Sequence, residues 1–518
     1  MGVSLVILVG LFRTFLAGGY MIETGSMAPC LMGDHRQVVC PACRYSFAVE
    51  GVAKSIKAVC PNCGQNHIAV EKFPRNEGDH LLVHRALFEF RRPRRWEVVV
   101  FRNPNKPTQA YVKRLVALPG ESLQIIDGDI YIGGTLRAKG YATQRGIGIP
   151  VYDHDFRPSN NEPDWQPRWV IESQEAGQPE SGWKETGGKF RFSTKKQDHA
   201  SELAWVYYRN WVRRGGMHTT KVQLTHWPES LERPQSGFGC ITFEEDAQTL
   251  VCRGALPFEQ RNQLLAATRD PDFRGAIQRL YEESHVAPVT DGYGYNRGHD
   301  GQGRHEVRDL MFTANVSLHD GPGTFVVAIT DGTEEFHCLF DLAQKQVRLI
   351  HTRTGRAMRT APLSDELLHG PVRVDVSLMD RQVLLAVGGK LAFKPLSYGA
   401  PVERGPTPRR PVRFGAAGTE VEVSSLRLFR DVYYSDDIGH HAIEAPVQLQ
   451  SNQYFVLGDN SPVSKDSRSW SSTTVLTDDM FLGKPLAVHL PSRNRRIRVG
   501  NWQTEIRIPE FSRMRYIH

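Results

Sequence analysis

Residues 111–120 read YVKRLVALPG, a short apolar run that contains a lysine. Apolar, β-branched runs of this length predict a strand buried in a sheet. Burial would disfavour the charged form of the Lys113 amine and make the amine available as a base. For this stretch alone, the alternative is a strand edge from which the amine reaches solvent.

Further apolar runs predict a β core around this strand. The predicted strands are 81–83, 98–101, 112–117, 122–126 and 454–457. Asp127-Gly128 lies between two apolar runs and predicts a tight hairpin turn. The predicted fold class is mainly β. The motifs described below assign residues 23–36, 72–136 and 431–518 to this core and leave 37–71 and 137–430 as insertions.

The length and charge of the chain limit its class. A chain of 518 residues is too long for one compact core and predicts about three domains. Its formal net charge of +7 is small, and its basic and acidic residues are interleaved. Nucleic acid is therefore not an expected partner. A basic balance is compatible with an anionic membrane surface.

The amino terminus is apolar from Val3 to Phe12 and, after Arg13, stays largely apolar to Ile22. A membrane-spanning helix needs about 20 apolar residues, so this segment is marginal in length. We interpret residues 1–22 as a membrane anchor. A cleaved signal peptide is the alternative, but no basic region precedes the run and no convincing small-residue cleavage site follows it.

Two more segments are rich in groups that carry chemistry. Residues 23–29, ETGSMAP, place Ser26 among small and turn-forming residues. Residues 458–468, GDNSPVSKDSR, combine hydroxyls, an amide and opposite charges. Taken singly, each segment is typical of an ordinary surface turn.

In order and content, these three segments resemble the signature motifs of the type I signal peptidases. That family has a serine in S-M-x-P just outside the membrane, a lysine in K-R-x-x-x-x-P-G, and then G-D-N-x-x-x-S-x-D-S-R. Residues 78–83 and 96–101 match its intervening segments. The resemblance implies a mostly antiparallel β core with Ser26 as the nucleophile and Lys113 as the general base. For that role the lysine pKa must fall from about 10.4 to roughly 7 or 8.

The resemblance also implies supporting residues. Ser464 matches the serine that orients the lysine, and Thr24 matches a hydroxyl that binds the oxyanion together with the Ser26 N–H. Catalysis by this pair needs no cofactor. Cys30 and Ser461 depart from the family pattern, which commonly has threonine and arginine there. Two ion pairs would brace the site: Arg114 with Asp459, and Asp466 with Arg468. Without the motifs, these would be surface pairs worth under about 1 kcal/mol.

The first insertion contains two C-x-x-C pairs with sixteen residues between them, at Cys40, Cys43, Cys60 and Cys63. This spacing predicts a zinc ribbon in which four thiolates bind one structural zinc and leave no open position for water. Two disulfides are the alternative, because the family's catalytic domain faces an oxidising compartment. A bridge within one C-x-x-C is a poor structural disulfide, so we favour zinc. The other four cysteines lack such spacing: Cys30, Cys240, Cys252 and Cys338.

The second insertion, 137–430, predicts a β-sandwich in its second half, where residues 372–378 and 383–387 read as strands. Residues 414–429 are similar to the closing strands of lectin-like, laminin-G-type jelly rolls. Such a domain could take a carbohydrate or a protein as its ligand. The first half is rich in tryptophan, which is more often core than a sugar platform: Trp165, Trp169, Trp183, Trp205, Trp211 and Trp227.

The resulting hypothesis is a signal peptidase that cleaves the signal peptides of preproteins. It would be a single-pass protein in contact with membrane lipids, with its catalytic domain on the outer, non-cytoplasmic side of the cell membrane. One alternative is a membrane-anchored binding protein with a zinc ribbon, a lectin-like domain and an inactive peptidase core. A self-cleaving regulator with a Ser/Lys pair is the other, although those proteins lack the anchor and the third motif.

Overall fold

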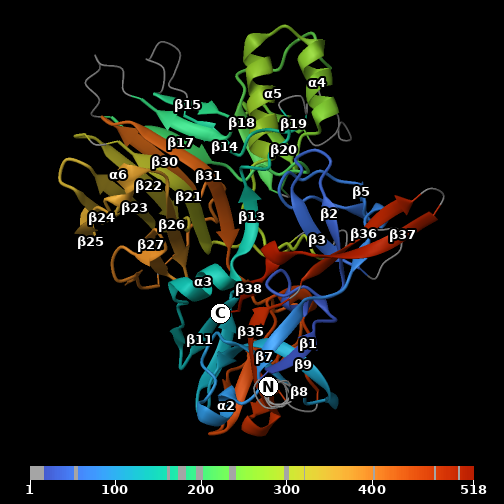
Figure 1. Ribbon diagram of the computed structural model, residues 1–518. Coiled ribbons are helices and arrows are strands. Elements are labelled where there is room, and N and C mark those ends of the chain that lie inside the picture. The colour runs from blue at the N-terminus through green and yellow to red at the C-terminus, as the bar shows by residue number, and fades with distance from the viewer. Residues whose placement is uncertain are drawn as a thin grey trace.

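The computed structural model contains several antiparallel sheets and few helices, and it confirms the predicted mainly-β fold class (Figure 1). It describes residues 17–51, 57–159, 164–172, 182–193, 202–216, 218–232, 241–296, 303–319, 321–400, 403–471, 474–489, 491–499 and 502–517. All structural statements below concern these residues.

One eight-stranded sheet brings the signature segments together. In sheet order its strands are β1 (Ala17–Met21), β7 (His80–His84), β35 (Phe481–Val488), β8 (Val98–Asn103), β9 (Lys106–Ala117), β33 (Gln453–Leu457) and β34 (Leu476–Thr477), with β38 (Arg515–Tyr516) beside β35. Leu457, at the end of β33, lies opposite Arg114 on β9. Residues 458–468 follow β33 directly, so the third motif begins beside the lysine segment.

A smaller sheet contains the predicted hairpin. It consists of β12 (Thr135–Leu136), β11 (Asp129–Ile132), β10 (Ser122–Ile126) and β32 (Val447–Gln448). At the turn, Asp127 and Gly128 both have positive φ, 50° and 81°, as a two-residue type I′ hairpin requires. The hairpin prediction is confirmed, and each of the five predicted core strands lies within an observed strand.

The first insertion is built on two small sheets. One contains β3 (Ser46–Glu50), β2 (His35–Val39) and β6 (Arg75–Asn76), and the other contains β4 (Lys57–Ala58) and β5 (Ile68–Ala69). Each C-x-x-C pair closes a turn in which the N–H four residues after its first cysteine donates to that cysteine's carbonyl oxygen, from Arg44 and from Gly64. Both donor residues have positive φ, so the two turns share one backbone geometry.

The second insertion contains a sandwich of two sheets that share one core. Phe312 and Phe414 come from opposite sheets, and their rings stack at 6.3 Å. One sheet has β15 (Trp183–Thr186), β16 (Lys189–Phe192), β31 (Val421–Arg430), β21 (Leu310–Leu318), β26 (Val372–Met379), β27 (Gln382–Val387) and β28 (Lys390–Leu391), with β13 (Ile149–Asp153) and β29 (Leu396–Ser397) at its sides. The other has β14 (Trp169–Ile171), β17 (Ala204–Tyr208), β30 (Val412–Ala417), β22 (Thr324–Thr330), β23 (Glu335–Asp341), β24 (Gln346–His351) and β25 (Arg356–Pro362).

The sandwich is larger than the sequence predicted. Its expected place was the second half of 137–430, but strands β13 to β17 from the first half join its two sheets. Of these, β13 and β16 pair with β31, and β17 pairs with β30. These early strands are only three to five residues long, so their period-two pattern is too short to recognise.

A separate subdomain lies between the two halves of the sandwich sequence. Helices α4 (Phe258–Ala267) and α5 (Pro271–Ser284) pack on the sheet of β18 (Thr219–Gln223), β20 (Thr249–Arg253) and β19 (Ile241–Glu244) (Figure 1). Asp270 caps α5 by accepting from the N–H groups of Asp272 and Phe273. The remaining short elements are α2 (Leu87–Phe90), α3 (Tyr141–Ile147), α6 (Glu366–His369) and the hairpin of β36 (Ser492–Val499) and β37 (Trp502–Pro509).

Most tryptophans of the insertion are core residues. Trp205 is half-buried, and the Arg413 guanidinium lies 4.5 Å from its ring. The other five are buried: Trp165, Trp169, Trp183, Trp211 and Trp227. These side chains therefore stabilise the domain and do not form an exposed aromatic platform.

Residues 1–16 of the predicted anchor lie outside the described residues. The last part of that segment, Ala17–Met21, is not helical but forms β1, which pairs with β7. Its two glycines and apolar residues meet the backbone of a core strand, and this pairing satisfies those of their N–H and C=O groups that face β7. No helix in the described ranges has the length and apolar character to cross a bilayer.

A buried charge cluster fastens the second insertion to the core. Lys139 lies between Asp380 of the sandwich and Asp431, with its Nζ 2.6 Å from a carboxylate oxygen of each. The three side chains are at most 3% exposed. The single amine therefore holds two carboxylates that would otherwise repel each other in a dry environment.

We expect Lys139→Met to lower the free energy of unfolding by about 3–5 kcal/mol, because it leaves two buried carboxylates without their cation. Urea unfolding of the intact chain measures the change. Lys189→Met is the matched control, since the Lys189–Glu422 pair is largely exposed and should contribute under about 1 kcal/mol. Equal losses in the two variants would contradict the assignment.

Candidate active site

Ser26 lies in a short 3-10 turn, η2 (Gly25–Met27), that directly follows the end of β1 and residues 22–24. Met27 and Ala28 are buried, and the Ala28 N–H donates to the Gly25 carbonyl oxygen at 3.0 Å. Ser26 itself is half-buried. The apolar residues around the serine thus fix the turn and leave the hydroxyl at its surface.

Lys113 extends from β9 to this turn. Its Nζ donates to Ser26 Oγ at 2.5 Å and to the Val112 carbonyl oxygen at 3.2 Å, and the residue is 3% exposed. Burial lowers the pKa of Lys113 to about 8, although the carboxylates of Asp466 and Asp459 act in the opposite direction. Near neutral pH a useful fraction of this amine is therefore uncharged.

Both expected ion pairs are present, and both are buried. The Arg114 guanidinium donates to the two Asp459 oxygens at 2.8 and 2.7 Å. Arg468 donates to the two Asp466 oxygens at 3.0 and 2.8 Å. Burial opposes ionisation of Asp466, but the Arg468 charge and its hydrogen bonds hold the pKa of this carboxyl below its usual value.

The Ser464 hydroxyl does not make the expected hydrogen bond to the lysine. Its Oγ is buried without a partner of ordinary geometry among the described residues, and Asp466 is a polar neighbour. The hydroxyl lies against Gly458, where a Cβ would clash with both Ser464 Oγ and the Ser26 carbonyl oxygen. Ser464 is therefore next to the turn that contains Ser26, but the sequence did not reveal which way its side chain points.

Thr24 is exposed just before the turn, and its side chain makes no capping hydrogen bond. Cys30, one of the departures from the family pattern, is in contact with Arg114 at 3.8 Å. Burial, followed by the Asp459 charge, raises the pKa of Cys30 to about 11, so this thiol stays protonated. Ser461, the other departure, accepts from Arg468 through its hydroxyl at 2.9 Å.

The structure adds residues that the sequence did not indicate. Asn460 donates to the Gly25 carbonyl oxygen through its side chain and to the Ser26 carbonyl oxygen through its backbone N–H. The Asn460 side chain is in turn paired with Asn296 from the second insertion. Asn460 belongs to the third motif and could have been named from it, whereas nothing in the pattern around Asn296 marked it.

The four cysteines of the first insertion lie together. Cys40 Sγ is 3.6 Å from Cys63 Sγ, Cys43 Sγ is 3.7 Å from Cys60 Sγ, and all four sulfurs lie within 4.8 Å of one another. A disulfide bond is about 2.05 Å long. Tetrahedral zinc with bonds of about 2.3 Å would separate its sulfurs by about 3.8 Å. The arrangement therefore fits a four-thiolate zinc site.

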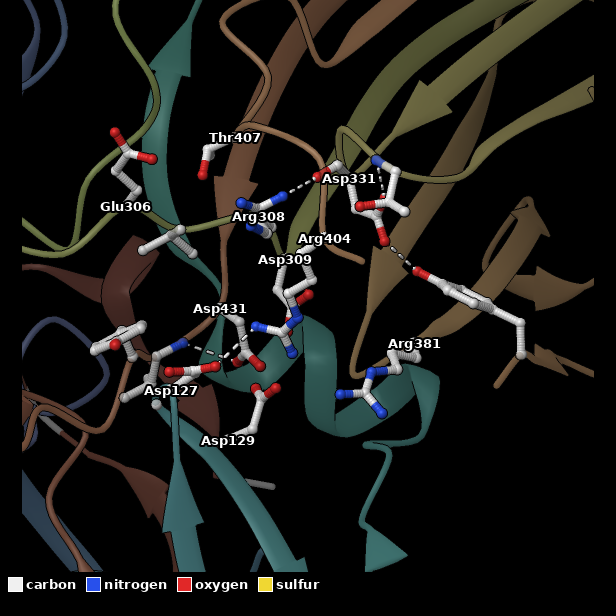
Figure 2. Close-up of a pocket in the computed structure, with 16 residues that line it drawn as sticks. Asp127, Asp129, Glu306, Arg308, Asp309, Asp331, Arg381, Arg404, Thr407 and Asp431 are labelled. Atoms are coloured by element: carbon white, nitrogen blue, oxygen red, sulfur yellow. Dashed lines mark hydrogen bonds and ion pairs between the residues drawn. The ribbon is translucent and has the colours of Figure 1, made fainter. Parts of the chain in front are cut away.

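A cavity of about 320 Å³ lies where the core hairpin meets the insertion and is shown in Figure 2. Asp129 and Asp309 face it, and with Asp380 they place carboxylate oxygens within 4.8 Å of one another. Burial, followed by the Asp380 charge, raises the pKa of Asp129 to about 7. The cavity lining does not include Ser26 or Lys113 and so lies outside the candidate active site.

The comparison with family models matches the part of the chain that contains Ser26 and Lys113. The family model described as Signal peptidase, peptidase S26, matches residues 1–166, about a third of the chain. Signal peptidase I of Rickettsia typhi is 52% identical over 42 residues, 8% of this chain and 16% of that protein. Signal peptidase I of Rickettsia bellii is 24% identical over 130 residues, 25% of this chain and 37% of that protein. The chain thus spans well under half the length of these relatives.

Similar solved structures include the carbohydrate binding module CBM66 from Bacillus subtilis. That chain has a TM-score of 0.18 and 9% identity, over 23% of this chain and 74% of its own length. A galectin-like protein of the same organism has a TM-score of 0.20 and 12% identity, over 23% and 71%. At these scores, the description of the inserted domain rests on its own strands. Residues 1–166 thus match a signal peptidase family model, and they contain both Ser26 and Lys113.

We expect Lys113→Met to stabilise the protein by about 3 kcal/mol at pH 7, because it removes a charge that burial makes unfavourable. The sign follows from the lowered pKa: between pH 8 and about 10.5 the unfolded chain binds the proton more tightly, so wild-type stability rises with pH. Urea unfolding should therefore show a difference that shrinks across this range. A difference independent of pH would contradict a desolvated amine.

We expect one zinc per chain, bound by the four clustered thiolates. Elemental analysis should find it in the wild type and in Cys338→Ser, whose thiol is buried in the sandwich, but not in Cys60→Ser. Chelation should loosen the ribbon, because binding of a structural metal is coupled to folding. A metal-free wild type whose mass shows two disulfides would overturn the prediction.

Proposed function

We propose that this protein is a type I signal peptidase that removes amino-terminal signal peptides from exported preproteins. The observation that carries the proposal is the 2.5 Å contact between the Lys113 amine and the Ser26 hydroxyl, at a place where burial lowers the pKa of the lysine to about 8. The family match of residues 1–166 and the short matches to rickettsial signal peptidases support it.

In the proposed reaction, the neutral Lys113 amine accepts the Ser26 proton as Oγ attacks the carbonyl carbon of the scissile bond. The ammonium then gives this proton to the departing nitrogen, the C–N bond breaks, and an ester remains on Ser26. Water loses a proton to the same amine and attacks the ester. The proton returns to Ser26 Oγ as the new carboxylate leaves.

Two hydroxyls complete the proposed mechanism. Thr24 Oγ1 and the Ser26 N–H would bind the oxygen that becomes negative in the tetrahedral intermediate, and losing one such donor typically costs about a hundredfold in rate. We assign Ser464 the role of orienting the lysine amine. Support comes from its position beside the nucleophile turn and from its buried hydroxyl, whose unmet hydrogen bond would cost about 1–3 kcal/mol.

The proposal includes a place in the cell. The apolar residues that precede β1 would anchor the chain in the membrane lipids, with the catalytic domain on the outer, non-cytoplasmic side. Ser26 follows the last residue of β1 by only five positions, which would keep it close to the membrane surface where a signal peptide emerges. The sandwich would take a carbohydrate or a protein as its ligand.

Cleavage of a test preprotein by the purified protein tests this proposal. We expect Ser26→Ala and Lys113→Arg each to reduce cleavage by at least about 1,000-fold, because nucleophile and base act as one unit and arginine stays charged. Lys465→Arg is the matched control, since this lysine is exposed in the loop of the third motif. Full activity of Lys113→Arg would exclude the lysine as base.

The same assay tests the substrate. Type I signal peptidases cut after small residues at the first and third positions before the scissile bond, as at the end of signal peptides. Replacing the alanine just before the cut by phenylalanine should abolish cleavage, because overfilling a packed apolar pocket is costly. Equal rates on both substrates would refute the assignment, and no cleavage by wild type would favour the binding protein with an inactive core.

A further inference from the structure

The nucleophile turn is held by a segment from the second insertion, residues 291–296, which we call the clamp. Asn296 and Asn460 exchange two hydrogen bonds through their amides, at 2.9 and 2.7 Å. The same Asn460 amide donates to the Gly25 carbonyl oxygen at 2.9 Å, and the Asn460 N–H donates to the Ser26 carbonyl oxygen at 3.0 Å. Asn460 thus connects the clamp to two carbonyl groups of the turn, through its side chain and its backbone.

Both N–H groups and the oxygen of the Asn460 side chain are hydrogen-bonded in this arrangement. Its two N–H bonds go to Gly25 and Asn296, and its oxygen accepts from Asn296. Asn460 is fully buried and Asn296 is 8% exposed, so water is poorly placed to replace a lost partner. Without Asn296, one donor and one acceptor of Asn460 would stay unmet, and the amide could rotate away from the turn.

Two tyrosines of the clamp reinforce this contact. The Tyr295 ring covers Gly25 so closely that a Cβ on that glycine would overlap it. Its hydroxyl donates at 3.0 Å to the carbonyl oxygen of Asp34, which follows the turn in the sequence. The Tyr293 hydroxyl donates to the Asp459 carbonyl oxygen at 2.6 Å. The clamp therefore touches the turn, the residues after it and the loop of the third motif.

The clamp is itself fixed by the two inserted domains. Arg430, at the end of β31 in the sandwich, donates to the carbonyl oxygens of Asp291 and Gly292, both at 2.9 Å. On the ribbon side, the Glu50 N–H donates to the Tyr295 carbonyl oxygen at 3.0 Å. Pro61, inside a C-x-x-C turn, packs on Gly294, where a Cβ would be 2.9 Å from its ring. The clamp has little freedom to move away.

We propose that Asn296 is a positioning residue of the peptidase, through which the second insertion keeps the Ser26 hydroxyl on the Lys113 amine. This inference rests on the proposed function only where it is tested by the kinetics of preprotein cleavage. Asn296 touches neither the substrate nor the reacting atoms and acts through Asn460. Its loss should lower kcat and leave KM nearly unchanged, because the substrate still binds while the nucleophile is misplaced.

The test compares Asn296→Ala with Asn210→Ala. Asn210 is also buried in the second insertion and donates to the Pro288 carbonyl oxygen, but has no contact with the turn. We expect at least a tenfold fall in kcat for Asn296→Ala, with KM within about twofold, and wild-type kinetics for Asn210→Ala. Equal kinetics in the two variants would overturn the proposal.

A second measurement does not depend on cleavage. In Ser26→Cys, the Lys113 ammonium should lower the pKa of the new thiol, which the pH midpoint of alkylation by iodoacetamide reports. Adding Asn296→Ala should raise that midpoint by about one pH unit, because the thiol moves away from the charge, whereas adding Asn210→Ala should leave it unchanged. Asn296→Ser replaces Asn296→Ala if the latter does not fold.

The two measurements separate the outcomes. A midpoint shift in a protein that cleaves no preprotein would retain the positioning role and reject the proposed function. Normal cleavage without a midpoint shift or a fall in kcat would retain the function and reject the positioning role.

Discussion

The buried ion pair between Arg114 and Asp459 is the interaction on which the candidate active site depends. The guanidinium meets both carboxylate oxygens and also donates to the Trp96 carbonyl oxygen at 2.7 Å. Arg114 and Asp459 are 345 positions apart in the sequence, so the pair joins the lysine strand to the loop after β33 across the whole second insertion. Either charge alone in this place would be costly by several kcal/mol. The pair can therefore form only in the assembled core. Once formed, it fixes the strand of Lys113 against the loop after β33.

This pairing also explains the state of the lysine. Asp459 and Asp466 are close enough to raise the pKa of Lys113, and two unpaired carboxylates would keep the amine charged. Each carboxylate instead has its own guanidinium, from Arg114 and from Arg468. The amine is left with burial as the dominant influence, and its pKa falls to about 8. Because Arg114 and Arg468 already neutralise the two carboxylates, the Lys113 amine does not need to be charged to balance them.

Sequence patterns predicted those features of the fold that depend on residues close together in the chain. The strand of Lys113 and the Asp127-Gly128 hairpin could be predicted, because apolar periodicity and turn geometry depend on neighbouring residues. That Ser26, Lys113 and residues 458–468 belong to one site was predicted from the resemblance to a family. Asn296 could not be predicted, since its role exists only after Asn460 is placed against the nucleophile turn. The end of the anchor segment was misjudged because Ala17–Met21 is apolar, and composition alone does not separate a helix in lipid from a strand in a core.

The register of β13 with β31 has a further consequence. Ile149 lies opposite Arg430, so the chain leaves the core and returns to it at adjacent points. A domain whose ends meet can be acquired as a single genetic event with little disturbance to its host, because the host chain need not rearrange to accommodate it. The clamp belongs to this inserted domain, and its Asn296 amide and its two tyrosines contact the Ser26 turn and the loop after β33. Loss of the domain, although simple for the chain connectivity, would therefore remove contacts from the candidate active site.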